Sequence, residues 1–266
     1  MGILVWQQAV AIILTGSATL LRGKSLTLER RHLGLYLGVM LLGSVAPGFF
    51  SYTAAAQLPA GVMSLIIALV PLFAMPIALT MGFETPSLRR LLGLLFGAAA
   101  VVVLVAPSAS LPDPDKAIFV LVAMLSTLAY GGEANFLEWN GRRKKGDTPD
   151  PFQILFWASI FGLMITVPLS LGSGHFIDPR LAWGAAGWAI ICVAVLSTFA
   201  YAGYIWLISH TGPIFAAQVA YMVTGFGLIW SMLLLSESYS SWVWLSVLLI
   251  AAGLFLVQPQ RQETAP

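Results

Sequence analysis

The chain has 266 residues, of which 59% are hydrophobic and 9% charged, and its net charge is +2. Soluble domains use roughly 25% charged residues, so this composition excludes a water-soluble fold. A net charge this small also gives no reason to expect a nucleic-acid partner. We therefore expect an integral membrane protein whose surroundings are the lipid bilayer.

Apolar runs account for nearly the whole chain. A helix that crosses the hydrocarbon core needs about 20 mainly apolar residues. Nine such runs follow one another: 3–21, 33–55, 61–81, 91–105, 117–137, 152–171, 183–208, 214–235 and 242–257. Because lipid offers no hydrogen-bond partners and the runs do not alternate with polar residues, helices are favoured over a barrel. The sequence predicts an all-α protein with nine transmembrane helices.

The basic residues predict the orientation of these helices. Eleven of the thirteen Lys and Arg residues fall on one side: Arg22, Lys24, Arg30, Arg31, Arg89, Arg90, Arg142, Arg143, Lys144, Lys145 and Arg261. Lys116 and Arg180 fall on the other side. The positive-inside rule makes the basic side cytoplasmic. We therefore expect Met1 outside and the C-terminus inside a bacterial inner membrane, with the first run retained as a helix.

An internal repeat emerges when the chain is shifted by 152 residues. The sixth to ninth runs then fall on the first to fourth, and a turn at 58–61 falls on one at 210–213. The fifth run has no counterpart. This pattern predicts a first repeat at 1–107 that lacks its opening helix, a second at 117–259, and a cytoplasmic tail at 260–266. Five helices per copy is an odd number, so the copies are inverted across the membrane.

The C-terminal part carries a family resemblance. A turn of Leu235, Ser236 and Glu237 joins a helix to a short final helix with a late Gly253. The stretch from Gly212 to Gln260 thereby resembles the EamA type of the drug/metabolite transporter superfamily. Ser236 and Ser238 stand where that family often has Gly and Arg. The resemblance implies a secondary transporter, commonly an exporter of amino acids or other small metabolites, with a central cavity between the repeats.

Glu133 is the most informative residue, because it lies inside the fifth run, about four residues from its cytoplasmic end. A charged group at a helix centre costs about 3 kcal/mol on insertion, so it should face the bundle interior. Thr127 and Tyr130 precede it at three-residue spacing and share its face. We interpret this face as a cavity wall, with Glu133 as a candidate proton carrier or partner for a substrate ammonium. The alternative is a Glu that reaches the interface or caps a neighbouring helix.

Other polar side chains are candidates for the same cavity. They are Gln218, Tyr221 and Thr224 in the eighth run, Tyr201 and Tyr204 in the seventh, and Tyr52, the repeat mate of Tyr204. Hydrogen bonding between packed helices is the alternative role for such groups.

Helix-breaking residues recur at one level of the two repeats. Pro71 and Pro76 lie in the third run, and Gly225 and Gly227 lie at the equivalent level of the eighth. Pro removes a backbone hydrogen bond and Gly loosens a helix, so both runs can bend here. We predict a gate or hinge; a static kink is the alternative.

Signals for other functions are weak. Gly23, Lys24 and Ser25 mimic a phosphate-binding loop but lack its first glycine, and the three histidines have no metal-ligand spacing. We expect no enzyme, cofactor or metal, but a secondary transporter of a small molecule working by alternating access. The rival hypotheses are a truncated, transport-incompetent chain, half of a heteromeric pair, and an intramembrane sensor or enzyme. A homodimer is also compatible with the sequence.

Overall fold

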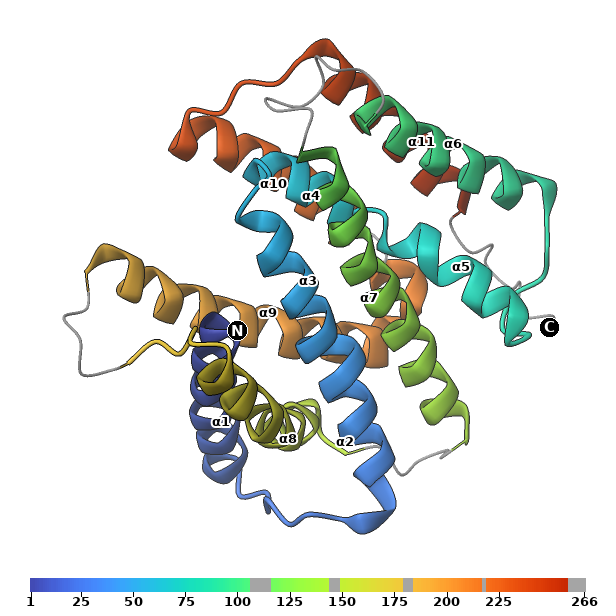
Figure 1. The fold of residues 1–266 in the computed structure, drawn as a ribbon. Helices are drawn as coiled ribbons and strands as arrows, with labels where there is room; N and C mark the ends of the chain where they lie inside the picture. Colours follow the sequence, from blue (N-terminus) through green and yellow to red (C-terminus); the bar gives the residue numbers. More distant parts are fainter. Residues whose placement is uncertain (106–115, 144–148, 179–183, 217–218, 258–266) are drawn as a thin grey trace. The chain divides into compact units, whose positions relative to one another are not determined.

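The computed structural model describes residues 1–105, 116–143, 149–178, 184–216 and 219–257, with the backbone alone at 105, 208–216, 220 and 221. Regular structure in these residues is entirely helical (Figure 1). The elements are α1 (Gly2–Leu21), η1 (Arg30–His32), α2 (Leu33–Val39), η2 (Met40–Val45), α3 (Ala46–Ala55), α4 (Ala60–Ile67), α5 (Val70–Thr80), α6 (Leu88–Val105), α7 (Ala117–Arg143), α8 (Pro151–Gly172), α9 (Ala185–Ala216), α10 (Val219–Leu235) and α11 (Ser241–Val257).

Each predicted apolar run lies on one or more of these helices. Six segments of the described chain are long and apolar enough to cross a membrane: 2–21, 30–55, 60–80, 117–143, 151–172 and 185–207. Shorter apolar helices lie at 222–235 and 241–257. The prediction of an all-helical membrane protein is therefore confirmed at the level of fold class.

One predicted turn is wrong. Residues 210–213 were expected to form a hairpin, but α9 continues through them to Ala216. Pro213 lies within this stretch, and a proline can sit inside a long helix because it removes only one backbone hydrogen bond and bends the axis.

The helices group into two compact units. Unit 1 comprises Met1–Phe49 and Phe136–His210, and unit 2 comprises Phe50–Asn135 and Thr211–Pro266. The chain passes from one unit to the other within α3, α7 and α9. Each unit therefore contains helices from both predicted repeats.

In unit 1, α1 lies along α8 with opposite direction. Near the start of α1, Trp6 Nε1 donates to the carbonyl oxygen of Ile177, just beyond the end of α8, at 3.0 Å. Beyond the end of α1, Lys24 Nζ lies 2.5 Å from the carboxylate of Asp150, the residue that caps the start of α8. Contacts at both ends thus establish the antiparallel pairing.

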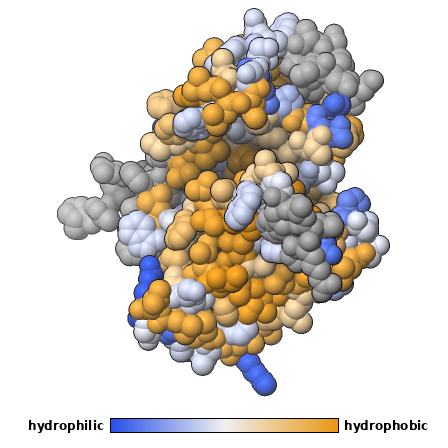
Figure 2. All heavy atoms as spheres, turned by 90° about the vertical axis from the view of Figure 1, so that its left-hand side faces the viewer, coloured by the Kyte–Doolittle hydropathy of each residue, from blue (hydrophilic) through white to orange (hydrophobic). Residues whose placement is uncertain are grey.

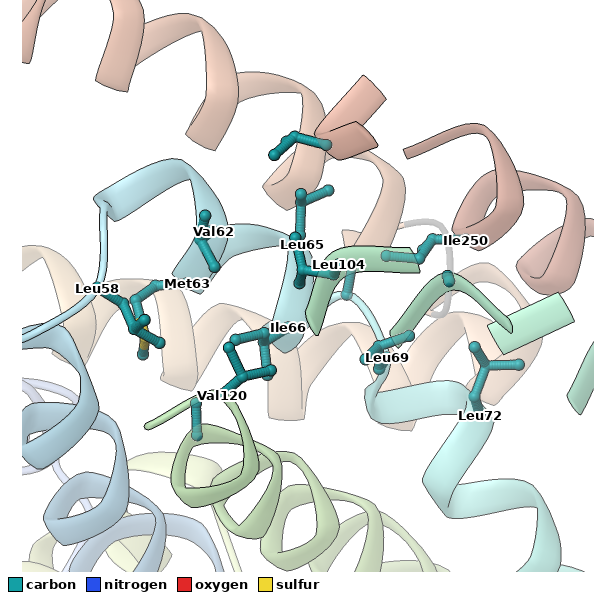
Figure 3. Packing of buried hydrophobic residues seen from close by; sticks show 14 of the residues in the cluster. Leu58, Val62, Met63, Leu65, Ile66, Leu69, Leu72, Leu104, Val120 and Ile250 are labelled. Carbon is teal, nitrogen blue, oxygen red and sulfur yellow. The ribbon is translucent and has the colours of Figure 1, made fainter. Parts of the chain in front are cut away.

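Unit 2 contains two further antiparallel pairs, α6 with α11 and α4 with α10. Arg89 at the start of α6 donates to the carbonyl oxygen of Phe255 near the end of α11, at 3.0 Å. In the second pair, Ser64 of α4 packs on Gly227 of α10. The unit has an aliphatic core, in which Ile66 of α4 and Val120 of α7 point toward each other (Figure 3).

Much apolar surface stays exposed in this chain. Leu196 and Leu233 are each 69% exposed, and Met164 is 67% exposed. Figure 2 shows one face that is mostly hydrophobic, with hydrophilic residues in small groups. Soluble monomers rarely expose contiguous apolar patches of this kind, so the surface fits contact with lipid tails.

Ser236 follows the end of α10 with φ of 54°, in the left-handed region that favours glycine. Gly82, which follows α5, has φ of 69° in the corresponding turn. The left-handed conformation costs a residue with a Cβ about 1 kcal/mol or more, so a glycine would suit this turn better than Ser236 does. Ser236→Gly is expected to raise the free energy of unfolding by about 1 kcal/mol. Unfolding of the purified variant in mild detergent measures this, and an unchanged or lower stability would contradict it.

Candidate functional site

The polar stripe of α7 is largely buried in unit 2. The side chain of Glu133 is only 4% exposed, and Thr127 is fully buried. Tyr130 is half-buried. The Thr127 hydroxyl donates to the carbonyl oxygen of Met124 in the same helix at 2.7 Å, so its proton is committed within α7. Tyr130 and Glu133 are therefore the stronger chemical groups of the predicted stripe.

Tyr52 of α3 lies near Tyr130. Glu133 and Tyr52 both lie within electrostatic range of the Tyr130 phenol. The structure thus brings together three of the predicted site residues from two helices, all within unit 2. A buried carboxylate with a phenol in electrostatic range can exchange a proton, accept hydrogen bonds or bind a cationic group of a substrate.

A neighbouring face of α7 makes a close contact with α5. A Cβ added at Gly131 would lie 2.9 Å from the backbone nitrogen of Ala74, so the two backbones touch. One turn later, Asn135 Nδ2 donates to the carbonyl oxygen of Ala74 at 2.9 Å and to that of Gly131 at 2.8 Å. Asn135 was not predicted as important, because its role depends on the helix that its amide group meets.

The third apolar run is broken where the prolines suggested. α4 ends at Ile67, α5 begins at Val70, and Pro71 occupies the first turn of α5. Because Pro71 has no N–H, the carbonyl of Ile67 cannot receive the usual helical hydrogen bond. Pro76 lies inside α5 without ending it.

The equivalent level of α10 is a continuous helix. A Cβ at Gly227 would lie 2.6 Å from the Ser64 hydroxyl oxygen, so this glycine allows α4 and α10 to pack closely. Gly225 has open space around it. Close packing thus explains why residue 227 is a glycine, whereas Gly225 has no contact that requires a glycine.

The remaining predicted residues are more dispersed. Thr224 is buried on α10 in unit 2. Tyr201 and Tyr204 lie on α9 in unit 1 and are half-buried, and Tyr201 packs beside Ala202 and Ile205. Gln218 lies outside the described residues, and only the backbone of Tyr221 is described.

A second buried polar group, in unit 1, was missed. Gln8 is 2% exposed, donates to the Ser44 hydroxyl at 3.2 Å and packs directly on Gly162. Ser44 belongs to η2, a π-helical turn that precedes Pro47. Its prediction would have required knowing that α1, η2 and α8 pack together.

The turn after α10 holds the start of α4. The Glu237 carboxylate accepts hydrogen bonds from the backbone N–H groups of Ala60 at 2.9 Å and Gly61 at 3.2 Å. Tyr239 donates to Glu237 and accepts from Gly61. Burial raises the pKa of the Tyr239 phenol, and the hydrogen bond to Glu237 raises it further. A carboxylate at a helix N-terminus satisfies orphan N–H groups, so this glutamate is a structural cap.

No set of three His, Cys, Asp or Glu side chains that could hold a metal ion occurs within the part of the chain that the structure describes. Apolar helices long enough to cross a membrane, with a carboxylate buried inside one of them, define a polytopic membrane protein with a functional group in a span. Residues 117–258, more than half of the chain, match the EamA-like transporter family. The chain belongs to this family, within the drug/metabolite transporter superfamily, and is a membrane transporter. The resemblance predicted from the Leu235–Glu237 turn is confirmed.

Related proteins agree with this assignment. The "Uncharacterized inner membrane transporter YedA" of Escherichia coli strain K12 is 24% identical over 273 aligned positions, covering 93% of this chain and 79% of that protein. The protein of the same name from Escherichia coli O157:H7 aligns equally well. A solved crystal structure, described only as that of a protein, matches 96% of this chain and 86% of its own at a TM-score of 0.65 and 15% identity. That similarity concerns the fold alone.

Proposed function

We propose that this chain is a secondary active transporter that exports an amino acid or another small metabolite by alternating access. Two inverted repeats, at 1–107 and 117–259, rock about a central cavity in this proposal. Export follows the usual direction implied by the family resemblance. The transported molecule approaches the polar groups on α7, where Glu133 is the principal charged residue.

The observation that carries this proposal is the direction of the packed helix pairs. The predicted shift makes α1 equivalent to α8, α5 equivalent to α10, and α6 equivalent to α11. Of these equivalents, α1 packs along α8 and α6 packs along α11, and both pairs are antiparallel. A two-fold axis in the membrane plane reverses a helix, so inverted copies produce antiparallel pairs and parallel copies would not. The pairing therefore supports inverted repeats.

The helix ends support the same relation. α1 and α8 each end at a left-handed glycine, Gly23 and Gly174, both with φ of 70°. α5 and α10 are each followed by a left-handed residue, Gly82 and Ser236. Equivalent helices are thus followed by a left-handed residue at nearly the same position when the chain is shifted by 152 residues.

Proton coupling through Glu133 is the second part of the proposal. A carboxylate within a membrane span is costly when charged, so loss or gain of its proton changes its interactions strongly. Tyr130, which lies within electrostatic range of Glu133, supplies a hydroxyl that can donate or accept a hydrogen bond in either state. A transporter can use this single group to couple the proton gradient to the movement of its substrate.

The proposed setting is a bacterial inner membrane, with the N-terminus outside and the C-terminus in the cytoplasm. The name of the Escherichia coli relatives supports this location. The uneven distribution of Lys and Arg supports the orientation. Arg22 and Lys24 lie near Asp150 in the structure, which is consistent with the first and fifth loops being on one side.

The break between α4 and α5 is proposed as the gate. Pro71→Ala restores the missing backbone donor and should favour a continuous helix across 67–70. We expect transport to slow several-fold while the amount of inserted protein stays the same. Radiolabelled substrate flux in membrane vesicles measures this, with Pro168→Ala as a control for loss of a proline elsewhere. Unchanged flux would mean that the break is a static kink.

The proposed activity is tested by comparing metabolites released from cells that carry the intact chain or an empty vector. Membrane insertion is verified by immunoblot of the membrane fraction. We expect one chemical class of compound to accumulate outside only with the intact chain. Equal release from both strains, despite normal insertion, would contradict export by this chain.

A further inference from the structure

The residues that contact α5 alternate along α7 with the residues of the polar site. Tyr130 and Glu133 lie on one side of the helix, whereas Gly131 and Asn135 lie on another. Glu133 and Asn135 are two positions apart, about 200° around a helix, and therefore point in nearly opposite directions. A single turn and a half of α7 thus carries both sets.

The contact with α5 is unusually direct. At Gly131 the α7 backbone meets the backbone of Phe73 and Ala74, because a Cβ there would lie 2.9–3.2 Å from their main-chain atoms. Asn135 adds hydrogen bonds to the carbonyl oxygens of Ala74 and Gly131. Both amide hydrogens of Asn135 are therefore engaged. No flexible side chain separates the two helices at Gly131, so a shift of α7 there moves α5 as well.

The position of this contact on α5 is important. Ala74 lies between Pro71 and Pro76, four residues after the start of α5 at Val70. The break before Val70 frees α5 from the helical hydrogen bonds of α4. α5 is thus the segment of this run that lies beyond the break, and α7 contacts it near its middle.

We propose that Gly131 and Asn135 are positioning residues that transmit the state of Glu133 to α5. A change of charge or ligand at Glu133 alters the position of α7. The contact at Ala74 then moves α5, the segment beyond the break. This inference rests on the proposed role of Glu133, but it concerns the connection between Glu133 and α5, not transport itself. It assigns a functional role to Asn135, which no polar-stripe pattern predicts.

The test uses the full chain in lipid nanodiscs and a reporter cysteine on α5. Cys192 is exposed and is first replaced by Ser. Ile77→Cys, at a half-buried position of α5, is labelled with a small soluble methanethiosulfonate reagent. Glu133→Gln represents the uncharged state of the carboxyl group, so no substrate is needed. The labelling rates of the Glu133 and Glu133→Gln chains are then compared.

In the chain with the intact contact, we expect Glu133→Gln to change the labelling rate of the reporter cysteine about fivefold. In a chain that also has Asn135→Leu or Gly131→Ala, we expect Glu133→Gln to change this rate less than about twofold. Gly132→Ala is the matched control, because Gly132 has open space around it and the response should persist. Asn135→Leu keeps the size of the side chain, so it remains informative if Gly131→Ala fails to fold. Size-exclusion profiles verify folding.

An equal response with and without the contact would overturn the proposal, as would no response in the intact chain. Neither result depends on whether metabolite release is detected. If release is absent but the α5 response requires Asn135, the connection stands and the proposed export fails. If release depends on Glu133 but the α5 response does not require Asn135 or Gly131, export stands and this connection fails.

Discussion

Glu133→Gln is expected to lower flux driven by a pH gradient on the order of a hundredfold, while the protein still inserts and folds. Glutamine keeps the size of the side chain and its hydrogen-bonding capacity but cannot carry a proton or a negative charge. Glu133 is 4% exposed inside a membrane span, where the difference between charged and neutral forms is greatest. The measurement is uptake into vesicles of the compound identified by metabolite release, with and without an imposed pH gradient.

Glu138→Gln provides a matched control on the same helix. Glu138 forms an ion pair with Arg142 at 2.5 Å near the end of α7, where side chains are exposed to solvent. Exposed pairs of this kind contribute at most about 1 kcal/mol, so little effect on flux or stability is expected. If the wild-type flux is the same with and without the pH gradient, Glu133 does not couple transport to protons.

The second large effect is on stability. Gly93→Ala is expected to lower the free energy of unfolding by about 2 kcal/mol, because it forces α6 away from α11. A Cβ at Gly93 would lie 2.8 Å from the carbonyl oxygen of Gly253 and 2.6 Å from a methyl carbon of Val257. The carbonyl belongs to the backbone and cannot rotate away. Thermal unfolding of the purified protein in detergent, followed by circular dichroism, measures the loss.

Gly34→Ala serves as the control, because nothing lies within 4 Å of the position a Cβ would take. Alanine forms helices better than glycine by about 1 kcal/mol, so this variant should be as stable as the parent or slightly more. If Gly93→Ala unfolds at the same temperature as Gly34→Ala, the α6–α11 contact contributes little to the fold.

The sequence predicts the helices well because their signal is local. Length and continuous hydrophobicity mark each run, and Pro71 predicts the break between α4 and α5 from backbone chemistry alone. Local signals are weaker where tertiary packing determines the backbone conformation. The turn expected around Pro213 is helical, and the π-helical turn at Met40–Val45 was not anticipated. Both concern prolines, whose local preference can be satisfied by more than one backbone path.

The candidate site shows the same division. Glu133 and Tyr130 could be identified from one helix, because a buried charge and three-residue spacing are visible in a single run. Asn135 and Gln8 could not, since their roles depend on which helices they meet: α5 for Asn135, and α8 with η2 for Gln8. The role of an amide side chain in a membrane span depends on the helix with which it forms hydrogen bonds. The repeat offset links equivalent helices but does not specify their contacts.

The most direct measurement of the central claim is counterflow in liposomes that contain only this purified chain. Liposomes are loaded with unlabelled substrate from the metabolite comparison and diluted into a trace of labelled substrate. Alternating access predicts a transient accumulation of label above the outside concentration, because each return of the transporter carries substrate. Simple equilibration without overshoot would indicate a channel, and no flux at all from correctly inserted protein would contradict transport by this chain.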